Sequence, residues 1–344
     1  MGQKIKAIGL VKPGNVSVLQ AMEIEVPTLA PNDIKVRIKA VSVNPIDTKT
    51  RDGGWPLSSD LPWVLGFDAS GVVEAVGAEA KRFKVGDEVM FAGSHTRNGT
   101  NSEVTVVDER IVGKKPKSLS HTHASALPLV GLTAWEALTE KLGIPENNEA
   151  KDLTLLIVNG AGGVGSFATQ LARNILNVKN VIVTASRPET IEWCKNQGAT
   201  HIINHRKPLK EQIDALGLTV DCAFLCFDTN GYLPILSEVV RPFGQIVSIV
   251  EVHEPINFGE ALFKAQTFHW ELMFVKPATN YDVLSQGLIL DKIADLIDNG
   301  TLKRLDTKTY DDLSVANLRE AHETLENGKS IGKIVLTVTD SSFQ

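Results

Sequence analysis

The chain has little cysteine, which excludes a fold held together by disulfide bonds. Only Cys194, Cys222 and Cys226 occur among its 344 residues. They lie within or beside apolar segments in the middle of the chain, so we expect reduced thiols that are buried as small hydrophobic side chains. The low cysteine content therefore excludes the class of small secreted proteins that are held together by disulfide bonds.

Long apolar runs and a basic excess are also missing. No run approaches the roughly 18 apolar residues of a membrane span, and the N-terminus lacks the basic and apolar regions of a signal peptide. With 35 basic and 41 acidic residues the net charge is −6, which indicates no surface for nucleic acid. We expect a cytoplasmic protein that binds neither membranes nor nucleic acid. Its length suggests two domains.

A glycine-rich turn is the most informative feature that is present. Residues 160–165 follow an apolar run at residues 153–159 and precede apolar side chains with helical spacing, from Val164 to Ile175. Strand, glycine turn and helix is the context in which this motif binds a dinucleotide, with the pyrophosphate at the helix N-terminus. The residues predicted to contact the cofactor are Gly160, Gly162, Gly163, Val164 and Gly165.

The end of the next strand indicates which dinucleotide is bound. Domains that bind NAD place Asp or Glu about 20 residues after the turn, where it holds the ribose 2′-hydroxyl. Here the strand at residues 180–185 is followed by Ser186 and Arg187, whose hydroxyl and guanidinium suit a 2′-phosphate. We therefore predict NADPH. Two alternatives stay open: Arg187 is a solvated loop residue, or Glu189 comes into range of the ribose and favours NADH.

The hydrophobic pattern divides the chain into parts with different predicted secondary structure. Residues 1–110 read as short strands punctuated by Gly, Pro, Asn and Asp, as in an antiparallel barrel. Residues 153–250 alternate strand and helix, which predicts a parallel sheet with helices on both faces. In the tail we expect helices at residues 284–297 and 315–325, stopped by Gly300 and Gly328, and a last strand at residues 334–338.

Several short segments form a specific set together with the glycine turn. They read VNPID at residues 43–47, LGFDASGVV at 65–73, VGDEV at 85–89, GLTA at 131–134 and GKIVL at 332–336. As a set they resemble the medium-chain dehydrogenase/reductase superfamily, in its zinc-independent quinone oxidoreductase branch. The resemblance implies an α/β fold: a β-rich GroES-like barrel domain from both chain ends (1–127 and 276–344), and a Rossmann domain with a central doubly wound parallel sheet (128–275).

The residues at the metal positions separate this chain from zinc-using members of the superfamily. Those members carry Cys where this chain has Asn44, and His where it has Phe67. Phenylalanine cannot ligate zinc, and an amide is a poor donor beside thiolate and imidazole. The third Cys ligand and the cysteines of a structural zinc lobe are missing as well. His121 and His123 have no evident partners to complete a site, and we expect a helix start or surface loop there. We predict no metal.

The resemblance also implies a set of catalytic residues. Asn44 would orient the substrate oxygen, because an amide both donates and accepts hydrogen bonds, although Asn44-Pro45 is also ordinary turn chemistry. Asp47 would brace that loop or bond a ribose hydroxyl, and Thr133 would lie beside the nicotinamide. The predicted substrate pocket includes Lys49, Trp55 and Phe67, helped by Trp63, and the further cofactor contacts are Asn204, Phe274 and Lys333. The alternatives are a Trp that anchors the core and a Lys49 that points into solvent.

The reaction that the resemblance implies is hydride transfer from NADPH to a quinone or an α,β-unsaturated carbonyl, with the proton taken from solvent. Two alternatives stay open: a zinc-type alcohol dehydrogenase-like enzyme, and a cofactor-binding accessory protein with little turnover. Residues 268–275 are rich in aromatic and apolar side chains at the place of an edge strand. Because an exposed apolar edge is normally covered or paired, we predict a homodimer; Phe274 folded inward would leave a monomer.

Overall fold

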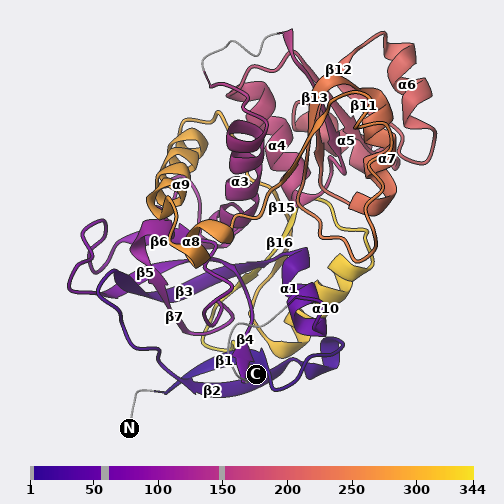
Figure 1. Ribbon diagram of the computed structural model, residues 1–344. Coiled ribbons are helices and arrows are strands. Elements are labelled where there is room, and N and C mark those ends of the chain that lie inside the picture. Colours follow the sequence, from indigo (N-terminus) through magenta and orange to yellow (C-terminus); the bar gives the residue numbers. More distant parts are fainter. Residues whose placement is uncertain (1–3, 56–61, 147–151) are drawn as a thin grey trace. The chain divides into compact units, whose positions relative to one another are not determined.

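The computed structural model describes residues 4–55, 62–146 and 152–344 (Figure 1). These residues belong to two compact units. Unit 1 combines Met1–Leu132 with Phe274–Gln344, and unit 2 is Thr133–Met273. The chain passes from the first to the second within α3 (Pro128–Trp135). No described helix has both the length and the apolar character required to cross a membrane.

Unit 1 contains two sheets that are mostly antiparallel. The larger has the order β15-β16-β3-β5-β6-β8 with β7 also paired to β3, and the smaller has the order β2-β1-β4. The strands are β1 (Lys4–Leu10), β2 (Gln20–Glu25), β3 (Asp33–Val43), β4 (Trp63–Val64), β5 (Asp68–Val76), β6 (Glu88–Phe91), β7 (Val104–Asp108), β8 (Val112–Lys114), β15 (Asp306–Tyr310) and β16 (Lys333–Thr337). The inward side chains of β3 are apolar and alternate with more exposed Lys and Arg, so one face builds the core.

Strand β3 lies at the centre of unit 1 and sets the position of the residues discussed below. Its end pairs antiparallel with β16, so that Val43 lies opposite Ile334. On its other side Ser42 lies opposite Asp68 of β5. The register of these pairs therefore brings residues near 43, 68 and 333 together, although they are far apart in sequence.

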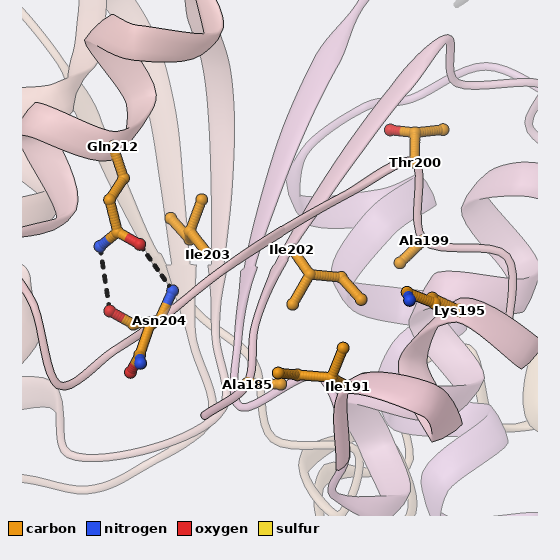
Figure 2. Close-up of a pocket in the computed structure, with 9 residues that line it drawn as sticks. All are labelled: Ala185, Ile191, Lys195, Ala199, Thr200, Ile202, Ile203, Asn204 and Gln212. Atoms are coloured by element: carbon orange, nitrogen blue, oxygen red, sulfur yellow. Dashed lines mark hydrogen bonds between the residues drawn. The ribbon is translucent and has the colours of Figure 1, made fainter. Parts of the chain in front are cut away.

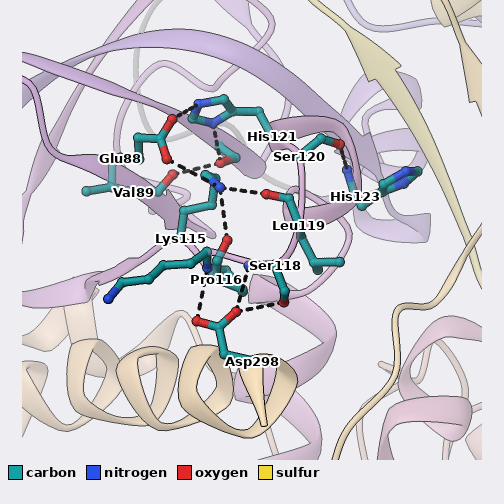
Figure 3. A network of polar contacts seen from close by, with 12 residues as sticks. Glu88, Val89, Lys115, Pro116, Ser118, Leu119, Ser120, His121, His123 and Asp298 are labelled. Atoms are coloured by element: carbon teal, nitrogen blue, oxygen red, sulfur yellow. Dashed lines mark hydrogen bonds and ion pairs between the residues drawn. The ribbon is translucent and has the colours of Figure 1, made fainter. Parts of the chain in front are cut away.

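The helices of unit 1 pack around these sheets. They are α1 (Pro45–Asp52), α2 (His121–Ala124), α8 (Val275–Thr279), α9 (Val283–Asp298) and α10 (Val315–Glu326). Helix α9 is pinned at its end, where the carboxylate of Asp298 accepts hydrogen bonds from the backbone N–H groups of Lys117 and Ser118 (Figure 3). The expected stops are confirmed, since Gly300 and Gly328 follow α9 and α10 with φ of 78° and 64°.

Unit 2 is a parallel six-stranded sheet with the order β11-β10-β9-β12-β13-β14. Its strands are β9 (Thr154–Val158), β10 (Asn180–Thr184), β11 (His201–Ile203), β12 (Val220–Leu225), β13 (Val240–Ser248) and β14 (Thr267–Trp270). Its helices are α4 (Gly163–Asn174), α5 (Pro188–Asn196), α6 (Leu209–Leu216), α7 (Thr229–Val239) and the π-helix η3 (Glu136–Lys141). The strand order reverses beside β9, as in a Rossmann fold, and the predicted fold class is confirmed.

Two details of the core bear on the sequence-based expectations. The three cysteines carry free thiols, with Cys194 and Cys222 buried and Cys226 half-buried. Trp63 is buried in the hydrophobic core of unit 1 and pairs with Leu10 of β1. Of the two roles considered for a Trp here, a pocket wall or a core anchor, the structure shows the core anchor for Trp63, because β4 directs this side chain into the core.

Candidate functional site

The carboxylate of Asp68 is the centre of a buried polar network in unit 1. Asp68 begins β5 and is fully buried. Its Oδ2 accepts hydrogen bonds from Ser42 Oγ at 2.8 Å, Asn44 Nδ2 at 2.9 Å and Lys333 Nζ at 3.0 Å. Its Oδ1 accepts from the backbone N–H of Leu129 at 2.7 Å. A buried carboxylate is stable only with such a set of donors, of which one is a cation.

Lys333 supplies that cation at the start of β16. Its ammonium donates to Asp68 Oδ2, to the Val43 carbonyl at 2.9 Å and to Asn44 Oδ1. An ammonium has three donors, so all of them are used inside unit 1, and the side chain is buried. The cofactor contact of Lys333 stays a prediction, and the side-chain partners that the structure shows are Asn44 and Asp68.

Asn44 is held by both of its side-chain polar atoms. Oδ1 accepts from Lys333, and Nδ2 donates to Asp68. The residue is also the N-cap of α1, and Pro45 at the first helical position starts that helix. Its backbone N–H donates to Asp47 Oδ2 at 2.7 Å. Of the two roles considered for Asp47, bracing the Asn44 loop is therefore the contact that the structure shows.

Asp47 is a buried acid with an unusual titration. Burial raises its pKa from 3.8 to about 7, although the hydrogen bond from the Asn44 backbone and the charge of Lys333 oppose the rise. Its Oδ1 has no hydrogen-bond partner among the described residues. A carboxyl group in this state holds a proton at mildly acidic pH.

Aromatic side chains lie in the same unit. The rings of Phe67 and Phe274 pack with centroids 4.6 Å apart, and the His95 ring lies 5.7 Å from Phe274. Trp55 follows α1, where its backbone N–H donates to the Lys49 carbonyl at 3.1 Å. These contacts bring Phe67 and Phe274 together, while the pocket roles of Lys49 and Trp55 stay predictions.

The glycine turn of unit 2 connects the end of β9 to α4. A Cβ atom at Gly160 would lie 2.6 Å from the Val183 side chain, and one at Gly165 would lie 2.3 Å from the Asn159 carbonyl. Only glycine fits these two positions. Helix α4 has Gly162 as its N-cap and no capping side chain, so its first N–H groups suit an anion such as a pyrophosphate.

Ser186, Arg187 and Asn204 follow the carboxyl ends of β10 and β11. Arg187 Nε lies 2.8 Å from Glu189 Oε1. The Glu189 carboxylate, which would favour NADH if it reached the ribose, is therefore paired with the Arg187 guanidinium. The backbone of Asn204 exchanges two hydrogen bonds with the Gln212 side chain (Figure 2). A cavity of about 370 Å³ lies here, with Ala185 and Asn204 among its lining residues. Thr133, in α3, is buried.

His121 and His123 have different partners, and Figure 3 shows the contact of His121 with Glu88. The His121 ring lies 2.8 Å from Ser70 Oγ and 3.1 Å from Glu88, whereas His123 Nδ1 lies 2.9 Å from Asp306. His121 begins the short helix α2, which is the context that the sequence predicted. Within residues 4–55, 62–146 and 152–344, no group of three or more His, Cys, Asp or Glu side chains could hold a metal ion.

Sequence reasoning missed the roles of Asp68 and Ser42. The sequence analysis named Asp68 only as a member of the motif at residues 65–73, in which Phe67 stands where zinc-using members have a ligand. The sequence does contain a feature that could have identified Asp68. It is a carboxylate in the run from Val64 to Val73, whose other side chains are mostly apolar or small. Such a carboxylate needs a buried cation, but the sequence does not say that Lys333 is the one.

Comparison with known proteins finds family models and relatives of the alcohol dehydrogenase type. Residues 30–117 match the alcohol dehydrogenase GroES-like domain, and residues 197–336 match the zinc-binding dehydrogenase family. A zinc-type alcohol dehydrogenase-like protein of Staphylococcus aureus (strain COL) is 38% identical, over 97% of this chain and 100% of the relative.

Two further matches are named as reductases. The 2-methylene-furan-3-one reductase of Solanum lycopersicum is 30% identical, over 97% of this chain and 79% of that protein. The crystal structure of Escherichia coli quinone oxidoreductase complexed with NADPH has a TM-score of 0.81 and 26% identity, covering 96% of this chain and 99% of that one.

The raised pKa of Asp47 predicts a pH-dependent stability. The folded value of about 7 lies above the unfolded 3.8, so the contribution of Asp47 is complete below the unfolded value and is lost as the pH rises through the folded one. Between these two pKa values, the free energy of unfolding of the wild type should fall relative to that of Asp47→Asn, by up to about 1.4 kcal/mol per pH unit. Thermal unfolding at pH 5 and pH 7 measures this, with the exposed Asp52→Asn as control. An equal Tm difference between wild type and Asp47→Asn at both pH values would contradict it.

Proposed function

Because the chain belongs to the medium-chain dehydrogenase/reductase superfamily and is an oxidoreductase of that type, we propose that it transfers hydride from NADPH to a quinone or an α,β-unsaturated carbonyl without a metal. The observation that carries the proposal is the Asn44 amide, tied to Lys333 and Asp68 at the position where zinc-using members have a thiolate. Next to it, Phe67 packs on Phe274 where those members have an imidazole.

The residues of unit 2 fit a nicotinamide dinucleotide. The close contacts at Gly160 and Gly165 keep the turn open to a pyrophosphate, which the first N–H groups of α4 would bind. When bound, the cofactor supplies the hydride. Ser186 and Arg187 would hold the 2′-phosphate, with Asn204 beside the adenosine. Burial and the charges of Arg206 and Arg187 lower the pKa of His205, so these loops gather positive charge, which supports NADPH.

The residues of unit 1 suit an electron-poor acceptor. Asn44 would bond the acceptor oxygen, and the Phe67–Phe274 pair would contribute an apolar aromatic surface that a flat ring or enone favours. Thr133 would help to place the nicotinamide. The names of two relatives, an enone reductase and a quinone oxidoreductase, support this choice of substrate. The zinc-type name of the Staphylococcus relative supports the main alternative, an alcohol dehydrogenase-like enzyme.

Steady-state oxidation of NADPH distinguishes these functions. We expect turnover with 1,4-benzoquinone or cyclohex-2-enone and little with cyclohexanone, because only the first two have a carbon that accepts hydride by conjugate addition. EDTA should not change the rate, and metal analysis of the same sample should find no stoichiometric zinc. Near one zinc per chain, with activity lost on its removal, would support the alcohol dehydrogenase alternative. No turnover with any acceptor would favour an accessory cofactor-binding protein.

Arg187→Ala should weaken NADPH binding and leave NADH binding nearly unchanged. A hydrogen bond to a charged group contributes about 1.5–3 kcal/mol, so the Kd for NADPH should rise roughly 10- to 150-fold. Glu189→Gln should lower that Kd, because it releases Arg187 from its ion pair. Fluorescence titration measures both, with Lys210→Ala on α6 as a matched loss of charge. An unchanged Kd for NADPH in Arg187→Ala would show that Arg187 is only a surface residue.

Phe274 is buried against Phe67, which is the inward placement that the monomer alternative requires. We nevertheless propose, from the exposed side chains near β14, that the chain forms a homodimer through the β14 edge. Strand β14 is the outer strand of the unit 2 sheet. Large apolar side chains nearby are exposed, with Phe243 at 76%, Leu262 at 83% and Phe263 at 90%. The backbone links them, since the Phe243 N–H donates to the Lys264 carbonyl at 2.8 Å. Pairing of this edge with a second copy would cover these side chains.

Light scattering tests the dimer at micromolar concentration. We expect the mass of two chains for the wild type and of one chain for Leu262→Asp/Phe263→Asp, because two charges at the centre of an apolar contact oppose association. Leu288→Asp, which changes an exposed side chain on α9 of unit 1, should stay dimeric. A wild type with the mass of one chain at every concentration would contradict the proposal.

A further inference from the structure

The side chain of Gln212 pairs with the backbone at the end of the edge strand β11. The Asn204 N–H donates to Gln212 Oε1 at 2.8 Å, and Gln212 Nε2 donates to the Asn204 carbonyl at 3.0 Å (Figure 2). These two bonds copy the pair that two residues exchange in an antiparallel ladder. Strand β11 has a neighbouring strand only on its β10 side. The Gln212 amide therefore takes the place of a strand beside Asn204.

Asn204 in turn fixes the shape of the turn that follows β11. Its Oδ1 accepts a hydrogen bond from the Arg206 backbone N–H at 2.9 Å, and its carbonyl accepts one from the Lys207 N–H at 3.0 Å. An Asn side chain that bonds the backbone two residues further on is a common way to hold a tight turn. The direction of Arg206 therefore depends on how the Asn204 backbone is held.

The turn adds positive charge beside the end of β10. Strands β10 and β11 are adjacent and parallel, so the residues that follow them meet at one edge of the sheet, where such folds bind ligands. Burial and the charges of Arg206 and Arg187 lower the pKa of His205, so both guanidinium groups act on the same ring. Like charges gathered in this way repel one another, and a bound anion would relieve the repulsion.

Arg187 alone does not balance the charge of a phosphate group. A phosphate monoester carries about −1.5 to −2 at neutral pH, whereas the charge of Arg187 is already offset by Glu189 at 2.8 Å. A second cation beside Arg187 would complete the balance. Arg206 is the cation that the turn after β11 brings into this region.

We propose that Gln212 is a positioning residue for NADPH: its amide holds the Asn204 turn, and the turn directs Arg206 to bind the 2′-phosphate together with Arg187. The inference rests on the proposed choice of NADPH and adds a residue that acts without touching the cofactor. The planar fork of a guanidinium matches a phosphate. Two such forks from neighbouring strand ends discriminate against NADH, which lacks this phosphate.

A purely structural role is the competing explanation for Gln212, because an edge strand with open backbone groups is normally covered. A structural role predicts equal effects on ligands with and without the phosphate. The positioning role predicts a loss that is confined to the phosphate and that disappears when Arg206 is absent. Gln212→Ala should fold, since the residue is only half-buried on α6 and alanine is the best helix former.

The probes are 2′,5′-ADP and 5′-AMP, which differ only in the 2′-phosphate and contain no nicotinamide. Calorimetric titration gives the Kd of each. We expect Gln212→Ala to raise the Kd for 2′,5′-ADP about tenfold and that for 5′-AMP less than about threefold, because a charge-assisted bond to the phosphate is lost. Circular dichroism and the Tm of the same samples show whether the variant is folded.

A double-mutant cycle tests whether Gln212 acts through Arg206. Arg206→Ala should also raise the Kd for 2′,5′-ADP, and Arg206→Ala/Gln212→Ala should lose no more than Arg206→Ala alone. Lys207→Ala removes the neighbouring cation of the same turn, and Thr219→Ala changes an exposed residue after α6. Both controls should bind 2′,5′-ADP like the wild type.

Each outcome bears on a different claim. Equal changes for both ligands in Gln212→Ala, an unchanged Kd for 2′,5′-ADP, or additive losses in the double variant would overturn the inference and leave the proposed function standing. A wild type that binds 2′,5′-ADP no more tightly than 5′-AMP would overturn the choice of NADPH and the inference together.

Discussion

The ion pair between Asp68 and Lys333 is the interaction on which the site depends. It joins two residues 265 positions apart, and it exists because β5 pairs with one edge of β3 while β16 pairs with the end of its other edge. Burying two charges costs several kcal/mol each, and the pair is stable only because further donors and acceptors complete both groups. Ser42, Leu129 and Val43 supply them here. The same contacts fix Asn44, so the stability of the barrel and the geometry of the site have one cause.

The network also bears on the proposed reaction without a metal. Its positive charge is the ammonium of Lys333, which contacts the Asn44 amide. Phe67, which packs on Phe274, makes the adjacent surface apolar. In the proposed reaction this apolar surface would suit a conjugated carbonyl.

The sequence predicted the features that depend on local order. The glycine turn, the helices of unit 2 and the alternation along β3 follow from periodicity and from glycine chemistry, and the structure contains them. It did not predict the partners of Lys333, because those depend on the register between strands that are distant in the chain. The sequence left the role of Trp63 open for a related reason: only the pairing of β4 with β1 decides which way a two-residue strand faces. The pairing of Arg187 with Glu189 depends on side-chain conformation at the start of α5, which no sequence pattern specifies.

A double-mutant cycle between Asp68 and Lys333 tests most directly whether this ion pair holds the site together. The quantity is the free energy of opening of unit 1, measured by native-state hydrogen exchange at amides of β3. Asp68→Asn and Lys333→Met should each lower it by about 3–5 kcal/mol, because each leaves a buried charge without its partner. The double variant should lose much less than the sum, since it contains neither charge. Additive losses would show that the two residues act independently and would contradict the account.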